Sequence, residues 1–229
     1  MFERLKTKVR NFREGYRREG SWYVLHAIMW RVPSWLFYYN HSVLAEAVQP
    51  KLITRQYKNY TVEAADADDI DSIARLEGFR REKIVSRLEA GDTCYMVKKN
   101  GLVVATSWGR VGKLFSVDSG ARIDTGDDAY FLYGLFTAPD ERGKGLHVSC
   151  LKANYEHYVK AGRKRAIGII HFGNVASIKT HQSMNFVVSG ETCYLRLLGI
   201  SVCYYKKWPH KRNKLEIMLK VPPAGFEWV

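Results

Sequence analysis

Four consecutive residues near the middle of the sequence could bind an anion. Arg142, Gly143, Lys144 and Gly145 follow an apolar, strand-like run and precede a segment with helical spacing. The first amides of a helix have no partner inside the helix, and the helix dipole adds partial positive charge at that end. The glycines let the backbone approach a ligand closely, and the two basic side chains add full charge. Together these features suit a phosphate or pyrophosphate group.

The loop matches neither of two common nucleotide-binding motifs. No Ser or Thr follows Lys144, as GxxxxGK[ST] requires, and the chain contains no GxGxxG. A nucleoside-triphosphate or dinucleotide site is therefore not expected, and the meaning of the loop depends on the elements around it.

Strands and helices alternate on both sides of the loop. Before it, the run AYFLYGLFT predicts a strand over 129–137. After it, apolar residues recur at spacings of three and four, which predicts a helix from Gly145 to Ala161. A buried strand (RKRAIGIIHF), a short helix (NVASIKTHQSM), a strand region (NFVVSGETCYLRLLG) and a last strand (KLEIMLKV) are expected next.

The segment from about residue 55 to residue 128 also alternates. KNYTVEAA predicts a strand, and DADDIDSIARLEG and REKIVSRLEAG predict two short helices. DTCYMVKKN and LVVATSWGRV flank Gly101 as an expected antiparallel pair of strands. KLFSVDSGARIDTGDD is turn-rich and predicts a surface loop or a short hairpin.

Residues 1–50 predict a separate basic, aromatic and helical layer. An amphipathic helix is expected from Phe2 to Tyr16, a second helix from Trp22 to Val32, and a third from Trp35 to Val48. This extension could pack on the main domain, lie on an anionic membrane surface or bind a partner. A spanning helix over 22–39 is not expected, because His26, Arg31 and Pro33 interrupt it.

Composition favours one large domain, or one domain with an extension. Of the 229 residues, 46% are hydrophobic, enough for a sizeable core, and the net charge of +13 favours acidic partners. The four cysteines show neither a CxxC pair nor zinc spacing, which predicts reduced thiols and no metal site. The N-terminus has no apolar secretion signal, so we expect a cytoplasmic protein.

Two motifs in this succession resemble the GNAT superfamily of acyl-CoA-dependent N-acyltransferases. The central motif of the family, V-x-P-x-x-[QR]-x-x-G-x-[GA], is similar to Thr137-Ala-Pro139-Asp-Glu-Arg142-Gly-Lys-Gly145-Leu-His147. The second motif, N-x-x-[AS]-x(3)-Y-x(3)-G-F, is similar to the segment containing Asn174, Ser177, His181, Asn185 and Phe186. Residues from about 55 to 195 follow the element order of the family.

The resemblance implies an α/β (α+β) GNAT fold. Its central sheet is mixed, mostly antiparallel, splayed at an acyl-CoA cleft and flanked by helices, and the helical extension over 1–50 precedes a GNAT domain over 51–229. The resemblance also implies three groups of CoA-binding residues. They would hold the pantetheine arm, the pyrophosphate, and the cofactor arm near the splayed strand, in that order: Leu135, Phe136 and Thr137; Arg142, Gly143, Lys144, Gly145, Leu146 and His147; Asn174 and Ser177.

Three residues are candidates for the chemistry. His181 stands where many relatives carry the Tyr that returns a proton to the departing CoA thiolate, and an imidazolium could do this near neutral pH. His171 ends the strand before Asn174 and could act on the amine as a base or through a water. The phenol of Tyr133 could orient the acceptor. Each of the three could instead have a purely structural role.

The resemblance implies transfer of an acyl group, most simply acetyl from acetyl-CoA, to a primary amine within a ternary complex. The expected acceptor is a small amine, first of all an amino sugar, because the basic extension looks like that of acyltransferases serving surface-polysaccharide or lipid assembly. The alternatives are long-chain N-acyl transfer from an acidic acyl-carrier protein, and a GNAT fold that binds membrane or nucleic acid without catalysis. Peripheral contact with the inner face of an anionic membrane is a further expectation for residues 1–50.

Overall fold

The computed structural model of the chain describes residues 37–53, 58–116, 118–198, 200–206, 214–218 and 227–228, the last two segments by their backbone only. The helices predicted before residue 35 lie outside the described residues. None of the helices in the described ranges has the length and apolar character needed to span a membrane.

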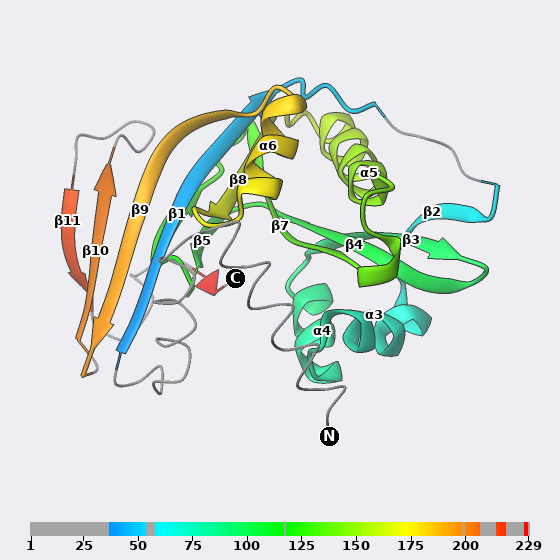
Figure 1. Cartoon of the computed structure of the whole chain (residues 1–229), viewed down its shortest axis with the longest axis horizontal. Coiled ribbons are helices and arrows are strands. Elements are labelled where there is room, and N and C mark those ends of the chain that lie inside the picture. Colours follow the sequence, from blue (N-terminus) through cyan, green and yellow to red (C-terminus); the bar gives the residue numbers. More distant parts are fainter. Residues whose placement is uncertain are drawn as a thin grey trace, which may run out of the picture.

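Two sheets organise the described chain (Figure 1). The large sheet has the strand order β11-β10-β9-β1-β8-β7-β4-β3-β2, and its neighbours are antiparallel except for the parallel pair β7 and β8. In chain order these strands are β1 (Phe37–Val48), β2 (Tyr60–Ala64), β3 (Thr93–Lys99), β4 (Leu102–Arg110), β7 (Ala129–Thr137), β8 (Arg165–His171), β9 (Val187–Leu197), β10 (Ile200–Lys206) and β11 (Lys214–Met218). The small sheet contains β5 (Lys113–Ser116), β6 (Ala121–Asp124) and β12 (Glu227–Trp228).

Helices cover both faces of the large sheet. The cluster that joins α5 (Leu146–Lys160) to β3 and β4 contains Val97 and Ala105. The cluster that joins α3 (Ile70–Glu77) and α4 (Arg81–Glu89) to the same strands contains Met96 and Trp108. Because successive side chains of a strand point to opposite faces, α5 and the α3–α4 pair lie on opposite sides of the sheet. The remaining helix is α6 (Val175–Ser183), and two short 3₁₀ turns, η1 (Ala67–Asp69) and η2 (Pro139–Glu141), precede α3 and α5.

Most of the predicted order is confirmed from residue 60 to residue 197. The strands, the two short helices after the first of them, the helix after the glycine loop and the short helix before β9 all lie where the sequence predicts them. The turn-rich segment forms the hairpin β5–β6, which is part of the small sheet. The strand β10 is an element that the sequence analysis does not contain.

The helix predicted from Trp35 to Val48 is wrong over residues 37–48. These residues form β1, which lies inside the large sheet and pairs antiparallel with both β8 and β9. Residues 42–45 are buried in succession, on both faces of the sheet, so this part of the segment shows neither a helical nor an alternating periodicity. The backbone hydrogen bonds to β8 and β9, which lie far away in the sequence, make the segment a strand. The division of the chain into an extension over 1–50 and a domain over 51–229 remains a prediction. Since β1 belongs to the large sheet, the prediction of a separate layer now concerns residues 1–36.

The parallel pair β7 and β8 parts halfway along its length. Only Ala129–Leu132 of β7 pairs with Arg165–Gly168 of β8, although β7 continues to Thr137 and β8 to His171. Where the two strands part, β7 carries one extra residue against β4, and Gly134 at this bulge has a φ of +56°. This confirms the splayed, mostly antiparallel sheet that the resemblance implies.

A side chain at position 134 should therefore strain the sheet. A Cβ on Gly134 would lie 2.6 Å from Cδ1 of Trp108, whose side chain is fully buried, and the backbone conformation disfavours L-residues. We expect Gly134→Ala to lower the free energy of unfolding by about 2 kcal/mol, measured by urea denaturation. Gly168→Ala is the matched control, because its Cβ would make an ordinary 3.9 Å contact with the Leu132 carbonyl. Equal losses in the two variants would contradict the role assigned to the bulge.

Candidate active site

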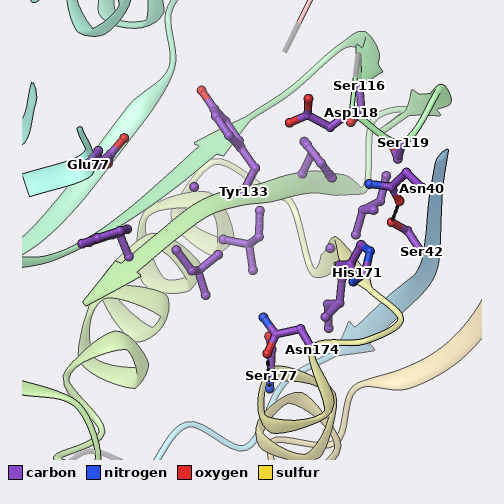
Figure 2. Close-up of a pocket in the computed structure, with 18 of the residues that line it drawn as sticks. Asn40, Ser42, Glu77, Ser116, Asp118, Ser119, Tyr133, His171, Asn174 and Ser177 are labelled. Carbon is purple, nitrogen blue, oxygen red and sulfur yellow. Dashed lines mark hydrogen bonds between the residues drawn. The ribbon is translucent and has the colours of Figure 1, made fainter. Parts of the chain in front are cut away.

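A cavity of about 440 Å³ lies where β7 and β8 part. Its walls come from β1, β7, β8, the turn between β5 and β6, the α3–α4 pair and the start of α6 (Figure 2). Phe131 belongs to the cluster under the small sheet, whereas Leu132 belongs to the cluster that includes residues of α5. Both residues line the cavity, so the cavity reaches both faces of the sheet through the parting of the strands.

The predicted cofactor residues gather at the C-terminal end of β7. Leu135 and Phe136 line the cavity from the part of β7 that β8 does not pair with, and Asn174 and Ser177 line it from the start of α6. Asn174 caps this helix, since its Oδ1 accepts a hydrogen bond from the amide of Ser177 at 3.2 Å. These four residues therefore lie around one space, as the resemblance implies.

The glycine loop lies beyond the cavity, where α5 begins. Gly143 and Gly145 have φ values of +82° and +74°, and a Cβ at either position would meet nothing within 4 Å. The open space beside the glycines and the first amides of α5 fit a pyrophosphate. Arg142 is held to the end of β7, because its Nε donates to the Thr137 carbonyl at 3.2 Å.

The ammonium group of Lys144 is paired with side chains of the protein itself. Its Nζ lies 2.6 Å from Oε2 of Glu141 and 3.2 Å from the hydroxyl of Tyr60. Lys99 binds the other oxygen of Glu141 at 2.7 Å. From the sequence, we expected the ammonium group of Lys144 to contribute its full charge to the anion site. The structure instead shows a lysine that anchors the loop to β2 and β3.

His181 is buried, with only 4% of its surface exposed, and lines the cavity from α6. Its Nδ1 lies 2.8 Å from the carbonyl oxygen of Ser177, so in the neutral ring this nitrogen carries the proton and Nε2 has the lone pair. Burial lowers the pKa of His181. Burial also lowers the pKa of His147, and the nearby His181 lowers it further. His181 can therefore act as an acid only in the fraction of molecules that carry a second ring proton.

His171 lies at the end of β8 and opposite Ser42 of β1. Its Nδ1 accepts a hydrogen bond from the amide of Gly173 at 3.1 Å. The neutral ring therefore carries its proton on Nε2 and can donate a hydrogen bond there. This state suits binding and orientation better than removal of a proton.

Tyr133 lines the cavity with its ring, while its hydroxyl donates to the buried carboxylate of Asp92. Asp92 is also paired with Arg110 at 3.1 Å. Burial and the carboxylate of Asp92 raise the pKa of Tyr133. The phenol is thus committed to Asp92, and only its ring is placed to contact an acceptor.

Sequence reasoning missed one buried carboxylate in the cavity wall, that of Glu77. It accepts hydrogen bonds from Thr106 at 2.7 Å and from Trp108 at 2.8 Å, and it pairs with Arg87 at 3.0 Å. The sequence candidates for the chemistry were His181, His171 and Tyr133, whereas Glu77 is the last residue of α3. Its position next to Gly78, which ends the helix, was the available signal.

Sequence reasoning also missed a polar wall on the opposite side of Tyr133 from Glu77. Asn40 and Ser42 come from β1, Ser116 comes from the end of β5, and Asp118 and Ser119 come from the β5–β6 turn (Figure 2). These residues were overlooked because one segment was predicted to be a helix and the other a surface loop.

The anchoring of the glycine loop predicts a specific pH dependence. Lys144, Lys99 and Tyr60 hold the pKa of Glu141 well below its usual range, at about 2. Since this pKa is lower than in the unfolded chain, the carboxylate stabilises the fold fully above about pH 5, and this contribution is lost as the pH falls toward 2. We expect the free energy of unfolding of Glu141→Gln to fall less steeply than that of the wild type between pH 5 and pH 3, measured by urea denaturation. Parallel curves would contradict the anchoring role.

The sequence is similar to known acetyltransferases over part of its length. No family model matches the chain. Over 59 residues, or 26% of its length, it is 36% identical to the L-methionine sulfoximine/L-methionine sulfone acetyltransferases of Pseudomonas paraeruginosa and Pseudomonas aeruginosa. The match spans 34% of the length of these curated relatives, about a third.

Two solved structures are similar in fold to this chain. One, from Novosphingobium aromaticivorans, is described as an acetyltransferase of the GNAT family and matches with a TM-score of 0.52 at 12% identity, over 68% of this chain and 62% of that one. The other, a conserved protein of unknown function from Staphylococcus epidermidis, matches with a TM-score of 0.50 at 10% identity, over 69% and 61%. The chain therefore has the fold of the GNAT acetyltransferases, and the fold that the resemblance implies is confirmed.

Proposed function

We propose that this protein is an N-acyltransferase that moves an acyl group, most simply acetyl, from acyl-CoA to a primary amine. One observation carries the proposal: the parting of β7 and β8 opens a cavity along the C-terminal half of β7, the strand that leads into the glycine loop and α5. An extended thioester arm could lie in the parting, with its pyrophosphate at the first amides of the helix.

The residues present fit CoA. Backbone groups from Leu135 to Thr137 are not paired with β8 and can bind the amides of a pantetheine arm. The loop from Arg142 to His147 offers amides beside open space, which suits the pyrophosphate. Asn174 and Ser177 line the cavity from the start of α6 and would contact the arm from there.

The reaction that suits this site is direct attack. The amine nitrogen forms a bond to the thioester carbonyl carbon, the carbon–sulfur bond breaks, and CoA leaves as a thiolate. Amides held at the edge of β7 can stabilise the oxyanion that develops on the carbonyl oxygen. One proton must leave the amine and one must reach the thiolate. His181 is our candidate donor to the thiolate, and His171 and the ring of Tyr133 are candidates for orienting the amine.

Acetyl-CoA should stabilise the folded protein through the glycine loop. At a hundredfold excess over Kd, binding adds about 2.7 kcal/mol to the free energy of unfolding, which should raise Tm by about 5 °C or more. We expect Gly145→Glu to abolish the rise in Tm, because its carboxylate would stand where the pyrophosphate is expected. Gly162→Glu is the matched control, because Gly162 lies at the other end of α5, has a similar φ of +83° and has similar open space. A full rise in Tm in Gly145→Glu would contradict the assignment of the loop.

The role of His181 can be tested through pH. Because burial lowers its pKa, the protonated form that could donate to the thiolate is present at low pH and is lost as the pH rises through that pKa. We expect the ratio of wild-type kcat to that of His181→Phe to be largest in acid and to fall toward one as the pH rises. The affinity for acetyl-CoA should change less than kcat. A ratio of one at every pH would remove His181 from the chemistry.

The acceptor has two candidate classes. The curated relatives act on L-methionine sulfoximine and L-methionine sulfone, which favours an amino-acid-like amine. The basic extension in the sequence favours an amino sugar. Long-chain transfer from an acyl-carrier protein has less support, because the cavity carries polar side chains on several of its walls. Peripheral contact of residues 1–50 with an anionic membrane remains a proposal from the sequence.

A further inference from the structure

We infer that the acceptor amine carries both hydroxyl groups and an anionic group, as in an amino sugar phosphate or an amino sugar acid. It would bind on the face of the sheet that is flanked by the β5–β6 turn and the α3–α4 pair. The inference rests on the proposed acyl transfer and names the substrate class of the same site.

The hydroxyl-binding wall is built from β1 and the β5–β6 turn. Asn40 and Ser42 lie two residues apart on β1, so their side chains share one face of the sheet, and Ser116 and Ser119 face them from the end of β5 and from the turn (Figure 2). Ser42 and Ser119 are each only 2% exposed. Amides and hydroxyls that both donate and accept suit a ligand rich in hydroxyl groups.

Hydrogen bonds hold this wall in place. The hydroxyl of Ser42 donates to Oδ1 of Asn40 at 2.6 Å, and Nδ2 of Asn40 lies 3.4 Å from the hydroxyl of Tyr38. Tyr38 in turn donates to the backbone carbonyl of Asp118 at 2.9 Å. The chain of bonds ties β1 to the β5–β6 turn, so both halves of the wall are positioned before a ligand arrives.

Two charged side chains of opposite sign complete the site. Asp118 lines the cavity from the turn, and Lys83 lines it from α4. Neither has an ion-pair partner among the residues that the structure describes, and the ammonium of Lys83 lies 4.5 Å from the ring centre of Phe79. Arg87 on the same wall is already paired with Glu77. The cavity therefore offers one carboxylate and one ammonium to a ligand.

These charges select between acceptor classes. Asp118 can attract the ammonium form of the acceptor before the proton is lost, and Lys83 can bind an anionic group at the other side of the cavity. A simple alkylamine would leave the hydroxyl-binding wall and Lys83 unused. An α-amino acid without hydroxyl groups would leave the hydroxyl-binding wall unused, and a site built to bind hydroxyl groups discriminates against a ligand that lacks them.

The test compares four amines with acetyl-CoA by the release of free thiol. The probes are glucosamine 6-phosphate, glucosaminic acid, glucosamine and L-methionine sulfone. We expect the phosphate ester or the sugar acid to have the highest kcat/KM, which also identifies the anionic group, and glucosamine to exceed L-methionine sulfone. A preference for L-methionine sulfone would overturn the inference.

Variants separate the two parts of the site. Lys83→Ala should raise KM for the best anionic probe about tenfold, the loss expected for one charged hydrogen bond, with little change for glucosamine. Lys160→Ala, at the exposed end of α5, is the matched control and should change neither value. Asn40→Ala should raise KM for all three sugar probes. An equal effect of Lys83→Ala on glucosamine would overturn the role of the cation.

A test of acetyl-CoA binding distinguishes a wrong acceptor class from a wrong proposed function. If acetyl-CoA raises Tm but amines without hydroxyl groups are acetylated best, acyl transfer stands and the acceptor class is wrong. If acetyl-CoA gives no rise in Tm and no amine releases thiol, the proposed function and this inference both fall.

Discussion

The structure depends on one constraint in the large sheet, the parting of β7 from β8. The strands pair only from Ala129 to Leu132, and the bulge at Gly134 turns the rest of β7 away. The indole of Trp108 occupies the space beside this glycine, so a Cβ at the bulge would strain the sheet. A sheet that closed fully would have paired the same backbone groups with β8 and left no room between the strands.

The elements around the parting hold it open from both faces. On one face, α5 and α6 bring the glycine loop, Asn174 and His181 to its edge. On the other face, the α3–α4 pair and the small sheet enclose the space above Tyr133. The buried carboxylates at this level are neutralised in place: Glu77 by Arg87, and Asp92 by Arg110. Such pairs keep charge out of the apolar layers while leaving the cavity polar.

The two faces of the parting differ in what the sequence could predict. The proposed cofactor side is encoded in two short motifs whose strands and helices are neighbours along the chain, so the resemblance of these motifs to the GNAT superfamily was sufficient to name its residues. The proposed acceptor side is assembled from segments that are far apart in the sequence, namely β1, the β5–β6 turn and α4. No local pattern links Asn40 with Asp118 or with Lys83, because their proximity comes from strand pairing and sheet packing.

The sequence by itself determined the family resemblance, the order of elements from residue 60 to residue 197 and the glycine loop, since these rest on local spacing and backbone preference. Only the tertiary structure decided that residues 37–48 are a strand between β8 and β9, because the two strands that pair with it lie far away in the sequence. The tertiary structure also decided which atoms of three candidate side chains carry a proton or form a hydrogen bond. The proton positions of His171 and His181 and the bond of Tyr133 to Asp92 depend on neighbours that the fold brings together.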